Sequence, residues 1–440
     1  MTRSLRDFVP LTENVVNMYV CGPTVYNYIH IGNARSAVAF DTIRRYFEYC
    51  GYTVNYISNF TDVDDKIIKA ANEAGISTKE LSDKFIAAFM EDTGQLGIKP
   101  ATQNPRVINY MDEIIAFVST LVDKGFAYVS EGDVYFRVAK SNNYAKLANK
   151  TLEDLEIGAS GRTDAETERK ENPLDFALWK AAKEGEVSWD SPWGPGRPGW
   201  HIECSVMATE ILGDTIDIHG GGADLEFPHH TNEIAQSEAK TGKTFANYWM
   251  HNGFVNVDNE KMSKSLGNFV TVHDMLQTVD GQVLRFFLAT QQYRKPINFT
   301  EKAIHDAEVN LKYLKNTHSL PLTEQVNQAE LQTYLDVFQE AMDDDFNTAN
   351  GVTVLFDMAK WINSGNYDQT VKDAFEKMLQ VFGIVFEEEV LDEDIEKLIE
   401  ERQAARANKD FATADRIRDE LAAQGIKLLD TKEGVRWTRD

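Results

Sequence analysis

The sequence predicts an α/β fold with a parallel sheet that is split by an insertion and followed by a helical bundle and a small C-terminal domain. Three observations support this prediction. A strand, a helix and a second strand follow one another within residues 15–57. Strand signals of the same kind return only after residue 200, and beyond residue 300 the apolar spacing becomes helical.

The first βαβ unit has clear boundaries in the sequence. Val15–Val20 is an apolar run that predicts a buried strand, and it leads into a turn at Cys21-Gly22-Pro23. We expect a helix from about Asn33 to Tyr49, ended by Gly51 just after its C-cap. Thr53–Ile57 then predicts a second strand. This pattern is typical of a parallel sheet that binds nucleotides.

The middle of the chain predicts an insertion between two halves of the sheet. Residues 63–97 have helical spacing, and residues 99–199 carry mixed signals, with a hairpin expected at Ala127–Val138. Trp189–Gly199 is so rich in Pro and Gly that we expect a stiff loop there and no regular element. We therefore interpret 99–199 as the inserted region.

The second half of the chain predicts two further strands and then mainly helices. The strands are expected near Thr215–His219 and Gly253–Val257, with a glycine loop after the first. Helical spacing dominates from about residue 300. In the tail we expect two helices, the second closed by Gly425, and a hairpin that pairs 426–429 with 435–437.

The composition limits the class of protein. The chain has 440 residues, 42% of them hydrophobic, and a formal net charge of -25. Its charged start lacks the apolar core of a signal peptide, and no apolar run approaches the roughly 18 residues of a membrane helix. Three cysteines do not suggest a disulfide framework, so we expect a cytoplasmic protein with no membrane partner. Residues 402–439 hold nine basic and six acidic residues, which makes this tail the segment expected to face an anion.

Two short motifs predict phosphate chemistry. His30 precedes an expected helix, so its imidazole and the free backbone N–H groups of the first turn can point at one phosphate. Gly32 lets a nucleotide approach where a Cβ would block it. Lys261 and Lys264, in Lys-Met-Ser-Lys-Ser, suit a mobile clamp on anionic oxygens. Each motif alone also fits a surface turn, but the two together favour nucleotide activation.

Four residues predict a metal site. Cys21 follows the first strand, Cys204 lies in Trp200-His201-Ile202-Glu203-Cys204, and His229 and Glu233 are spaced to share one helix face. Two thiolates, an imidazole and a carboxylate form a ligand set that zinc accepts. Buried, inert cysteines remain the alternative at this point, and Cys50 is expected to be one of them.

Longer motifs carry a resemblance to a known family. His30-Ile31-Gly32 together with Lys261-Met262-Ser263-Lys264-Ser265 resembles the class I aminoacyl-tRNA synthetases. Within that class the chain is similar to the cysteinyl enzymes, almost from end to end. The motifs that carry this likeness are Met18 to Tyr26, Gly199 to Ser205, His219 to Leu225 and Lys409 to Asp415.

The resemblance implies a domain organisation. We expect a Rossmann-like catalytic domain in two halves, 1–98 and 200–300, separated by the connective region 99–199. A helical bundle domain at 301–390 and an anticodon-binding domain at 391–440 would follow. Relatives usually begin a few residues earlier, so we also expect a short first strand to be missing here.

The resemblance also implies the roles of individual residues. One zinc ion per chain is expected on Cys21, Cys204, His229 and Glu233, with the substrate thiol beside it and Thr61 and Trp200 contacting cysteine. ATP, with Mg²⁺, is expected to bind His30, Gly32, Asn33, Gly221, Gly222, Asp224 and Lys264. Catalysis is expected from His30, Asn33, Lys261 and Lys264. Arg436 and Trp437 are expected to contact tRNA(Cys), and the protein is expected to be a monomer.

Some departures and rival functions remain. Asn33 stands where many relatives have histidine, so it keeps a hydrogen-bond donor but cannot carry charge. Thr231 replaces a frequent acid that is not a ligand by position. A cysteine ligase of mycothiol biosynthesis, acting on a glucosaminyl-inositol amine, would share the catalytic half and the zinc ligands. A zinc-stabilised nucleotide-binding module without catalysis would explain the metal ligands but not the lysine motif.

Overall fold

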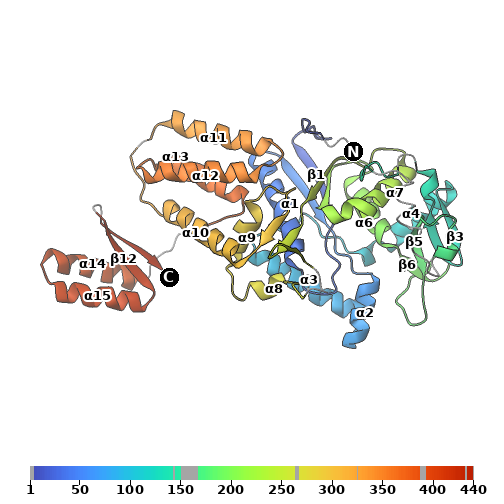
Figure 1. The fold of residues 1–440 in the computed structure, drawn as a ribbon, viewed down its shortest axis with the longest axis horizontal. Helices are drawn as coiled ribbons and strands as arrows, with labels where there is room; N and C mark the ends of the chain where they lie inside the picture. Colours follow the sequence, from blue (N-terminus) through green and yellow to red (C-terminus); the bar gives the residue numbers. More distant parts are fainter. Residues whose placement is uncertain are drawn as a thin grey trace. The chain divides into compact units, whose positions relative to one another are not determined.

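The computed structural model describes residues 4–141, 144–149, 167–262, 267–324, 326–386, 393–431 and 434–439. The chain divides into two compact units, Met1–Val385 and Phe386–Asp440 (Figure 1). Among the described residues, no helix combines the length and the apolar composition that crossing a membrane requires.

A parallel sheet of four strands forms the centre of the first unit. Its order is β2-β1-β7-β8, and every neighbouring pair is parallel. The strands are β1 (Val15–Val20), β2 (Thr53–Ser58), β7 (Ile216–Gly222) and β8 (Ala246–Asn252). The predicted strand, helix and strand at 15–57 are therefore confirmed. Helix α1 (Ile31–Tyr49) begins two residues earlier than expected, because the side chain of His30 caps it.

Both faces of this sheet are covered by helices, as a parallel sheet requires. On one face Met18 and Val20 pack with Phe40 of α1. On the other face Tyr19 packs with Ile202 and Val206. The helices of this second face are α4 (Met111–Asp123), α6 (Trp200–Leu212) and α7 (Thr231–Thr241). Successive residues of β1 thus point into two separate cores, which explains its continuous apolar run.

The expected insertion contains an antiparallel sheet with the order β3-β4-β5-β6. Its strands are β3 (Ala127–Ser130), β4 (Asp133–Phe136), β5 (Phe176–Ala181) and β6 (Gly196–Pro198). The predicted hairpin is confirmed by the pairing of β3 with β4. The expectation of a loop throughout Trp189–Gly199 is wrong, because its last part is the edge strand β6. Proline is accepted at such an edge, and a Cβ on Gly196 would lie 2.3 Å from the indole nitrogen of Trp179.

The second half of the sheet differs from the prediction in two places. The expected glycine loop after His219 is wrong, because Gly220–Gly222 continue β7. A Cβ on Gly220 would lie 2.3 Å from the ring of Phe40, so glycine allows α1 to pack closely there. The expected strand at Gly253–Val257 is present as β9 (Val255–Val257), but it belongs to a separate small sheet with β10 (Glu260–Lys261) and β11 (Ile297–Phe299). The fourth strand of the main sheet, β8, was not predicted.

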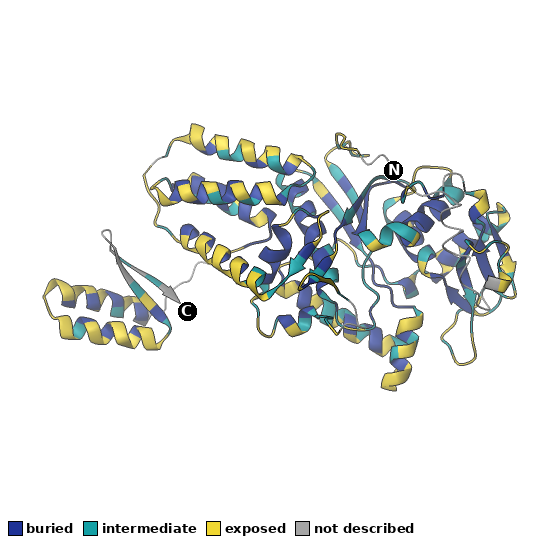
Figure 2. Cartoon of the chain, viewed as in Figure 1, coloured by how far each residue is buried: buried dark blue, intermediate teal, exposed yellow. Residues whose placement is uncertain are grey.

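Helices complete the first unit (Figure 1). Their faces toward the core are buried and their outer faces exposed, most clearly along α11 and α12 (Figure 2). The remaining helices are α2 (Asp65–Ala74), α3 (Thr78–Gln95), α8 (Val272–Met275), α9 (Gly281–Ala289), α10 (Glu301–His318), α11 (Gln328–Asp343), α12 (Thr348–Asn363) and α13 (Gln369–Val381).

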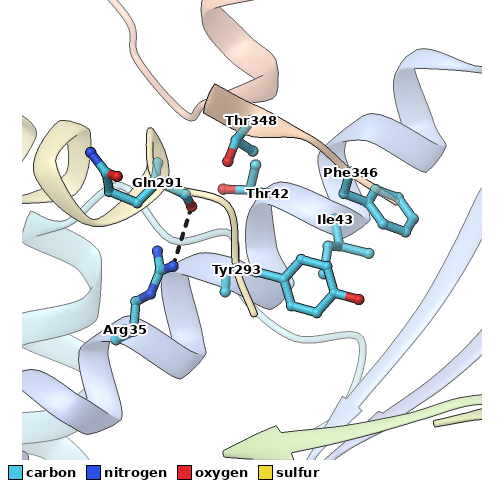
Figure 3. Close-up of a pocket in the computed structure, with 9 residues that line it drawn as sticks. Arg35, Thr42, Ile43, Gln291, Tyr293, Phe346 and Thr348 are labelled. Carbon is cyan, nitrogen blue, oxygen red and sulfur yellow. Dashed lines mark hydrogen bonds between the residues drawn. The ribbon is translucent and has the colours of Figure 1, made fainter. Parts of the chain in front are cut away.

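Two buried arginines hold α1 against the later helices. Arg285 of α9 pairs with Asp41 of α1 at 2.5 Å. Arg35 donates to the carbonyl oxygens of Leu288, Gln291 and Gln292 in the segment at the end of α9. Figure 3 shows Arg35 beside a small cavity between α1 and Tyr293, Phe346 and Thr348. The cavity leaves about 10 Å³ for the centre of a water molecule, which is room for one water.

The second unit is a pair of helices with a hairpin, as the tail predicts. It contains α14 (Glu393–Ala407), α15 (Phe411–Ala423), β12 (Ile426–Thr431) and β13 (Gly434–Arg439). Ile399, Ile417 and Leu421 form its core together with Ile395 and Ile426. The hairpin strands pair antiparallel, with Leu428 beside Trp437.

The expectation for Cys50 is wrong. This cysteine is exposed, because it is the C-cap residue of α1, and the chain turns away at Gly51.

Candidate metal centre and nucleotide site

The site residues gather where the four parallel strands end. Cys21 follows β1, Thr61 lies just beyond β2, and His251 is at the end of β8. The carboxyl ends of parallel strands form a crevice where the strand order reverses, here between β1 and β7. The topology therefore brings residues that are up to 230 positions apart to one edge of the sheet.

The four predicted metal ligands lie together in this crevice. One ligand atom from each of Cys21, Cys204, His229 and Glu233 falls within 4.8 Å of all the others. The two thiol sulfurs are 3.8 Å apart, and Glu233 Oε1 is 3.5 Å from Cys21 Sγ and 3.1 Å from His229 Nε2. Cys21 directly follows β1, Cys204 lies in α6 and Glu233 in α7, while His229 precedes α7 by two residues. The predicted grouping of these four side chains is confirmed, and zinc itself stays a prediction.

Burial and mutual contact shift the ionisation of this group. Burial alone would raise the pKa of Glu233, but His219 and His229 lower it to about 2. Burial would lower the pKa of His229, whereas Glu233 and Cys204 raise it to about 10. The hydrogen bond from Cys21 lowers the pKa of the Cys204 thiol to about 6. Burial, together with Cys204, raises the pKa of Cys21. The cluster therefore holds a carboxylate and one thiol that readily loses its proton.

The chemistry of these donors fits a thiophilic metal. A second overlapping group, with His219 and His230 in place of Cys204 and His229, shares Cys21 and Glu233. His219 already pairs with Glu233 Oε2 at 2.8 Å, and His230 with His251 at 2.8 Å. We therefore favour the first group, which contains both thiols, the softest donors that proteins offer to zinc.

His229 of the cluster belongs to a group of five histidines, and the other four were not predicted. They are His201, His219, His229, His230 and His251, which all lie within 50 positions of a chain that has nine histidines. His201 Nδ1 is 3.0 Å from His229 Nδ1. Burial lowers the pKa of His201, His230 and His251, so these rings are neutral near pH 7. Their clustering in the sequence was the available signal.

The two predicted cysteine contacts flank the metal cluster. Trp200 is 40% exposed and stacks on His229, with 4.3 Å between the ring centroids. Thr61 is buried, and its hydroxyl donates to Glu203 Oε2 at 3.3 Å. Glu203, which was not predicted, is fully buried, and burial raises its pKa. Trp200 thus presents a partly exposed indole over one ligand of the cluster, whereas Thr61 is buried beside Glu203.

The first phosphate motif forms the start of α1. His30 Nδ1 accepts from the backbone N–H of Asn33 at 3.2 Å, and Asn33 Oδ1 accepts from the backbone N–H of His30 at 3.1 Å. Asn33 therefore stabilises the start of α1. This capping role does not require a histidine at position 33. A Cβ on Gly32 would lie 2.9 Å from the ring of His30 and 3.6 Å from the terminal carbon of Met262.

The two phosphate motifs are thus neighbours in space. The backbone N–H of Ile31 donates to Val270, and that of Val272 donates to Ile29. Lys261 lies in β10, with its ammonium 5.5 Å from the ring centroid of Phe254. Lys264 lies outside the described residues. Of the described residues of the lysine motif, Met262 lies beside Gly32.

The other residues predicted to bind ATP or tRNA contact neighbouring parts of the protein. A Cβ on Gly221 would lie 2.9 Å from Leu225, and one on Gly222 would lie 2.4 Å from Asp224 Oδ1. In the second unit Trp437 packs against the core, and the side chain of Arg436 lies outside the described part. The ATP and tRNA contacts of these residues stay predictions.

Three family models match the chain in succession. Residues 7–309 match the tRNA synthetases class I (C) catalytic domain. Residues 337–387 match the DALR domain, and residues 388–437 match the cysteinyl-tRNA ligase anticodon binding domain.

The relatives and solved structures agree with these matches. The cysteine–tRNA ligase of Streptococcus thermophilus (strain CNRZ 1066) is 95% identical over 440 residues, which is 100% of this chain and 98% of the relative. That of Streptococcus pyogenes serotype M6 is 83% identical over the same shares. The fold is similar to Mycobacterium tuberculosis methionyl-tRNA synthetase, with a TM-score of 0.61 at 16% identity, over 84% of this chain and 88% of that one. The leucyl enzyme of Agrobacterium radiobacter K84, in a ternary complex with tRNA, gives a TM-score of 0.60 at 11% identity, over 86% and 84%. The chain belongs to the cysteine–tRNA ligases of class I.

Proposed function

We propose that this chain activates L-cysteine with ATP and transfers it to the terminal adenosine of tRNA(Cys). The observation that carries the proposal is that the cluster of Cys21, Cys204, His229 and Glu233 and the phosphate motif at 30–32 both follow the carboxyl end of β1. One group selects a thiol, and the other holds the phosphates of ATP.

Zinc would be held by Cys21, Cys204, His229 and Glu233. When bound, it supplies a soft Lewis acid that a thiolate ligates far better than a hydroxyl does. This property addresses the main problem of specificity, because cysteine and serine differ by a single atom that pocket shape separates weakly. Trp200 would cover the bound side chain from the exposed side.

The residues at the phosphate end would act by position and charge. In the first step a carboxylate oxygen of cysteine attacks the α-phosphorus of ATP, and pyrophosphate leaves. His30, Lys261 and Lys264 would stabilise the charge that develops on the phosphate oxygens, and Mg²⁺ would accompany ATP. In the second step a ribose hydroxyl of the terminal adenosine attacks the carbonyl carbon, and AMP leaves. The protein forms no covalent bond in either step, so the geometry of the reactants dominates.

The capped start of α1 supports this role for His30. The reciprocal hydrogen bonds with Asn33 hold the imidazole over the first turn, where the free backbone N–H groups attract an anion. Gly32 keeps the space between this ring and Met262 clear. Gly221, Gly222 and Asp224, at the end of β7, would lie near the adenosine ribose.

The second unit would bind tRNA. It matches an anticodon binding domain over 388–437, and its helices carry exposed basic side chains such as Arg416 and Arg418 in a chain that is otherwise strongly acidic. The same match disfavours a cysteine ligase of mycothiol biosynthesis, which has no need of an anticodon reader. We further propose that the protein acts as a monomer in the cytoplasm.

Pyrophosphate exchange with cysteine and with serine tests this function. Exchange that depends on cysteine, with serine at least about a thousandfold poorer, is expected if a metal reads the thiol. The same preparation should charge tRNA(Cys) and contain one zinc per chain. Equal exchange with serine, or full exchange by metal-free protein, would contradict the proposal.

A further inference from the structure

Asn59 connects the ends of two strands with the start of α6. It lies just after β2, and its side chain is 1% exposed. Its Oδ1 accepts a hydrogen bond from the backbone N–H of Gly22 at 3.0 Å and lies 3.7 Å from the Cys204 thiol. Its Nδ2 donates to Thr61 Oγ1 at 3.2 Å. One buried amide thus contacts the segments that carry both cysteines and the predicted substrate contact.

The backbone fixes which way this amide points. The N–H of Gly22 can only donate, so the atom facing it must be the carbonyl oxygen of Asn59. The amide nitrogen must then face Thr61. Gly22 also packs directly on the backbone of Asn59, where a Cβ on Gly22 would lie 1.7 Å from the carbonyl oxygen. The two segments are therefore held at a fixed separation.

This orientation determines the hydrogen bonds that Thr61 has left to offer. Its hydroxyl accepts from Asn59 and donates its only proton to Glu203 Oε2. A hydroxyl has one donor and two acceptor positions, so a single lone pair remains. Thr61 can accept a hydrogen bond from a ligand but cannot donate one.

We propose that Asn59 is a positioning residue that presents the Thr61 hydroxyl as an acceptor for the α-ammonium group of cysteine. The inference rests on the proposed function, in which Thr61 contacts cysteine. At neutral pH the ammonium is the donor of the amino-acid backbone, whereas the carboxylate needs donors from the protein. Asn59 thus gives the site a second criterion beside the thiol: the ligand must carry a cation at its α-position.

Two truncated analogues of cysteine distinguish recognition of the α-ammonium group from general support of the thiol site. Cysteamine keeps the thiol and the ammonium, and 3-mercaptopropionate keeps the thiol and the carboxylate. Their affinities for the zinc-loaded protein are measured by calorimetry, which does not require turnover. In Asn59→Leu, which is similar in size but has no donor, the Thr61 hydroxyl is free to turn. We expect the affinity for cysteamine to fall about tenfold or more, and that for 3-mercaptopropionate to change less than about twofold.

The kinetics and the controls follow the same logic. In Asn59→Leu the KM for cysteine should rise at least about tenfold, while the KM for ATP and the zinc content stay unchanged. Asn55→Leu is the matched control, because Asn55 lies in β2, four residues before Asn59, and donates to Asn17. It should bind both analogues normally. Thr61→Val should repeat the loss of cysteamine binding and Thr61→Ser should restore it, which keeps the test valid if Asn59→Leu folds poorly.

Several outcomes would overturn the inference. Equal weakening of both analogues, or loss of zinc, would mean that Asn59 supports the thiol site in general. Unchanged binding of cysteamine in both Asn59→Leu and Thr61→Val would mean that Thr61 does not bind the ammonium. Wild-type protein that binds the analogues but shows no exchange with cysteine would contradict the proposed function instead.

Discussion

Replacement of Arg285 by methionine should strongly destabilise the first unit. Arg285 is fully buried in α9, and its guanidinium pairs with Asp41 Oδ2 at 2.5 Å. It also donates to the carbonyl oxygens of Phe382 at 2.6 Å and Leu96 at 3.2 Å. This one side chain therefore joins α1, which starts at the phosphate motif, to the ends of α3 and α13.

The expected loss is about 3–5 kcal/mol, the usual cost of removing one member of a buried ion pair. Two carbonyl groups lose a charged donor, and each such loss costs roughly 1–3 kcal/mol. The carboxylate of Asp41 keeps partners, because Arg45 contacts it at 2.7 Å and the backbone N–H of Lys99 donates to it at 3.0 Å. Because Asp41 keeps these partners, the expected loss of unfolding free energy does not exceed about 3–5 kcal/mol.

The loss of unfolding free energy in Arg285→Met should depend on pH. Burial alone would raise the pKa of Asp41, but Arg285 and Arg45 lower it below its usual value. A carboxyl group whose pKa is lower in the folded state stabilises the protein above its unfolded pKa of about 3.9, and this contribution is lost as the pH falls through the folded pKa. In the variant the pKa of Asp41 rises. The difference from wild type should therefore be full at pH 7 and shrink below about pH 4.

Urea unfolding followed by tryptophan fluorescence measures this effect. Six of the seven tryptophans precede residue 385, so the signal reports the first unit. The midpoint should fall by about 1–2 M for this loss. Lys302→Met is the control, because the pair of Lys302 with Asp306 is exposed and worth at most about 1 kcal/mol. A decrease in the free energy of unfolding below about 1 kcal/mol at pH 7 in Arg285→Met would refute this account of how Arg285 stabilises the first unit.

Three further predictions concern the site, and a fourth concerns the second unit. His229→Ala should lose zinc and cysteine-dependent exchange together, and a zinc-free variant with full activity would disprove the metal assignment. Lys264→Ala should lower adenylate formation about a hundredfold, as removal of one charge-stabilising donor does, while metal analysis still finds one zinc; unchanged exchange would remove this lysine from the mechanism. Gly32→Ala should displace the ring of His30, because the new Cβ would lie 2.9 Å from it, and should lower kcat for exchange about tenfold or more without changing the KM for cysteine; an unaffected kcat would show that the ring position is not critical. Removal of residues 386–440 should spare pyrophosphate exchange and raise the KM for tRNA at least about tenfold, whereas unchanged charging would exclude this unit as the tRNA reader.

Local patterns predicted much of the fold. The apolar run of β1 and the glycine after α1 mark the first βαβ unit, because buried parallel strands and helix ends have strong local signatures. The strand β8 was missed because Ala246–Asn252 mixes polar and aromatic residues at the end of the sheet. The composition of Gly196–Pro198 predicts a loop, whereas its strand character comes from pairing with β5, which local composition does not report.

The sequence also predicted only part of the candidate site. Residue types and the resemblance to a known family predicted the four candidate metal ligands, and two short motifs predicted the phosphate-binding segments. Asn59, Glu203 and His219 were missed because their roles arise from contacts across more than one element. The number of histidines between 201 and 251 was the only local signal for part of that network.

By itself the sequence predicted the chemistry: the soft candidate ligands, the candidate phosphate-binding cations, and many of the strands and helices. Only the tertiary structure decided which of these groups meet and how each is oriented. The parallel order β2-β1-β7-β8 places Cys21, Thr61 and His251 at one edge, although they are far apart in the chain. The physical reason is that strand pairing and the buried amide of Asn59 depend on partners that are distant in sequence, so their hydrogen bonds leave no local pattern to read.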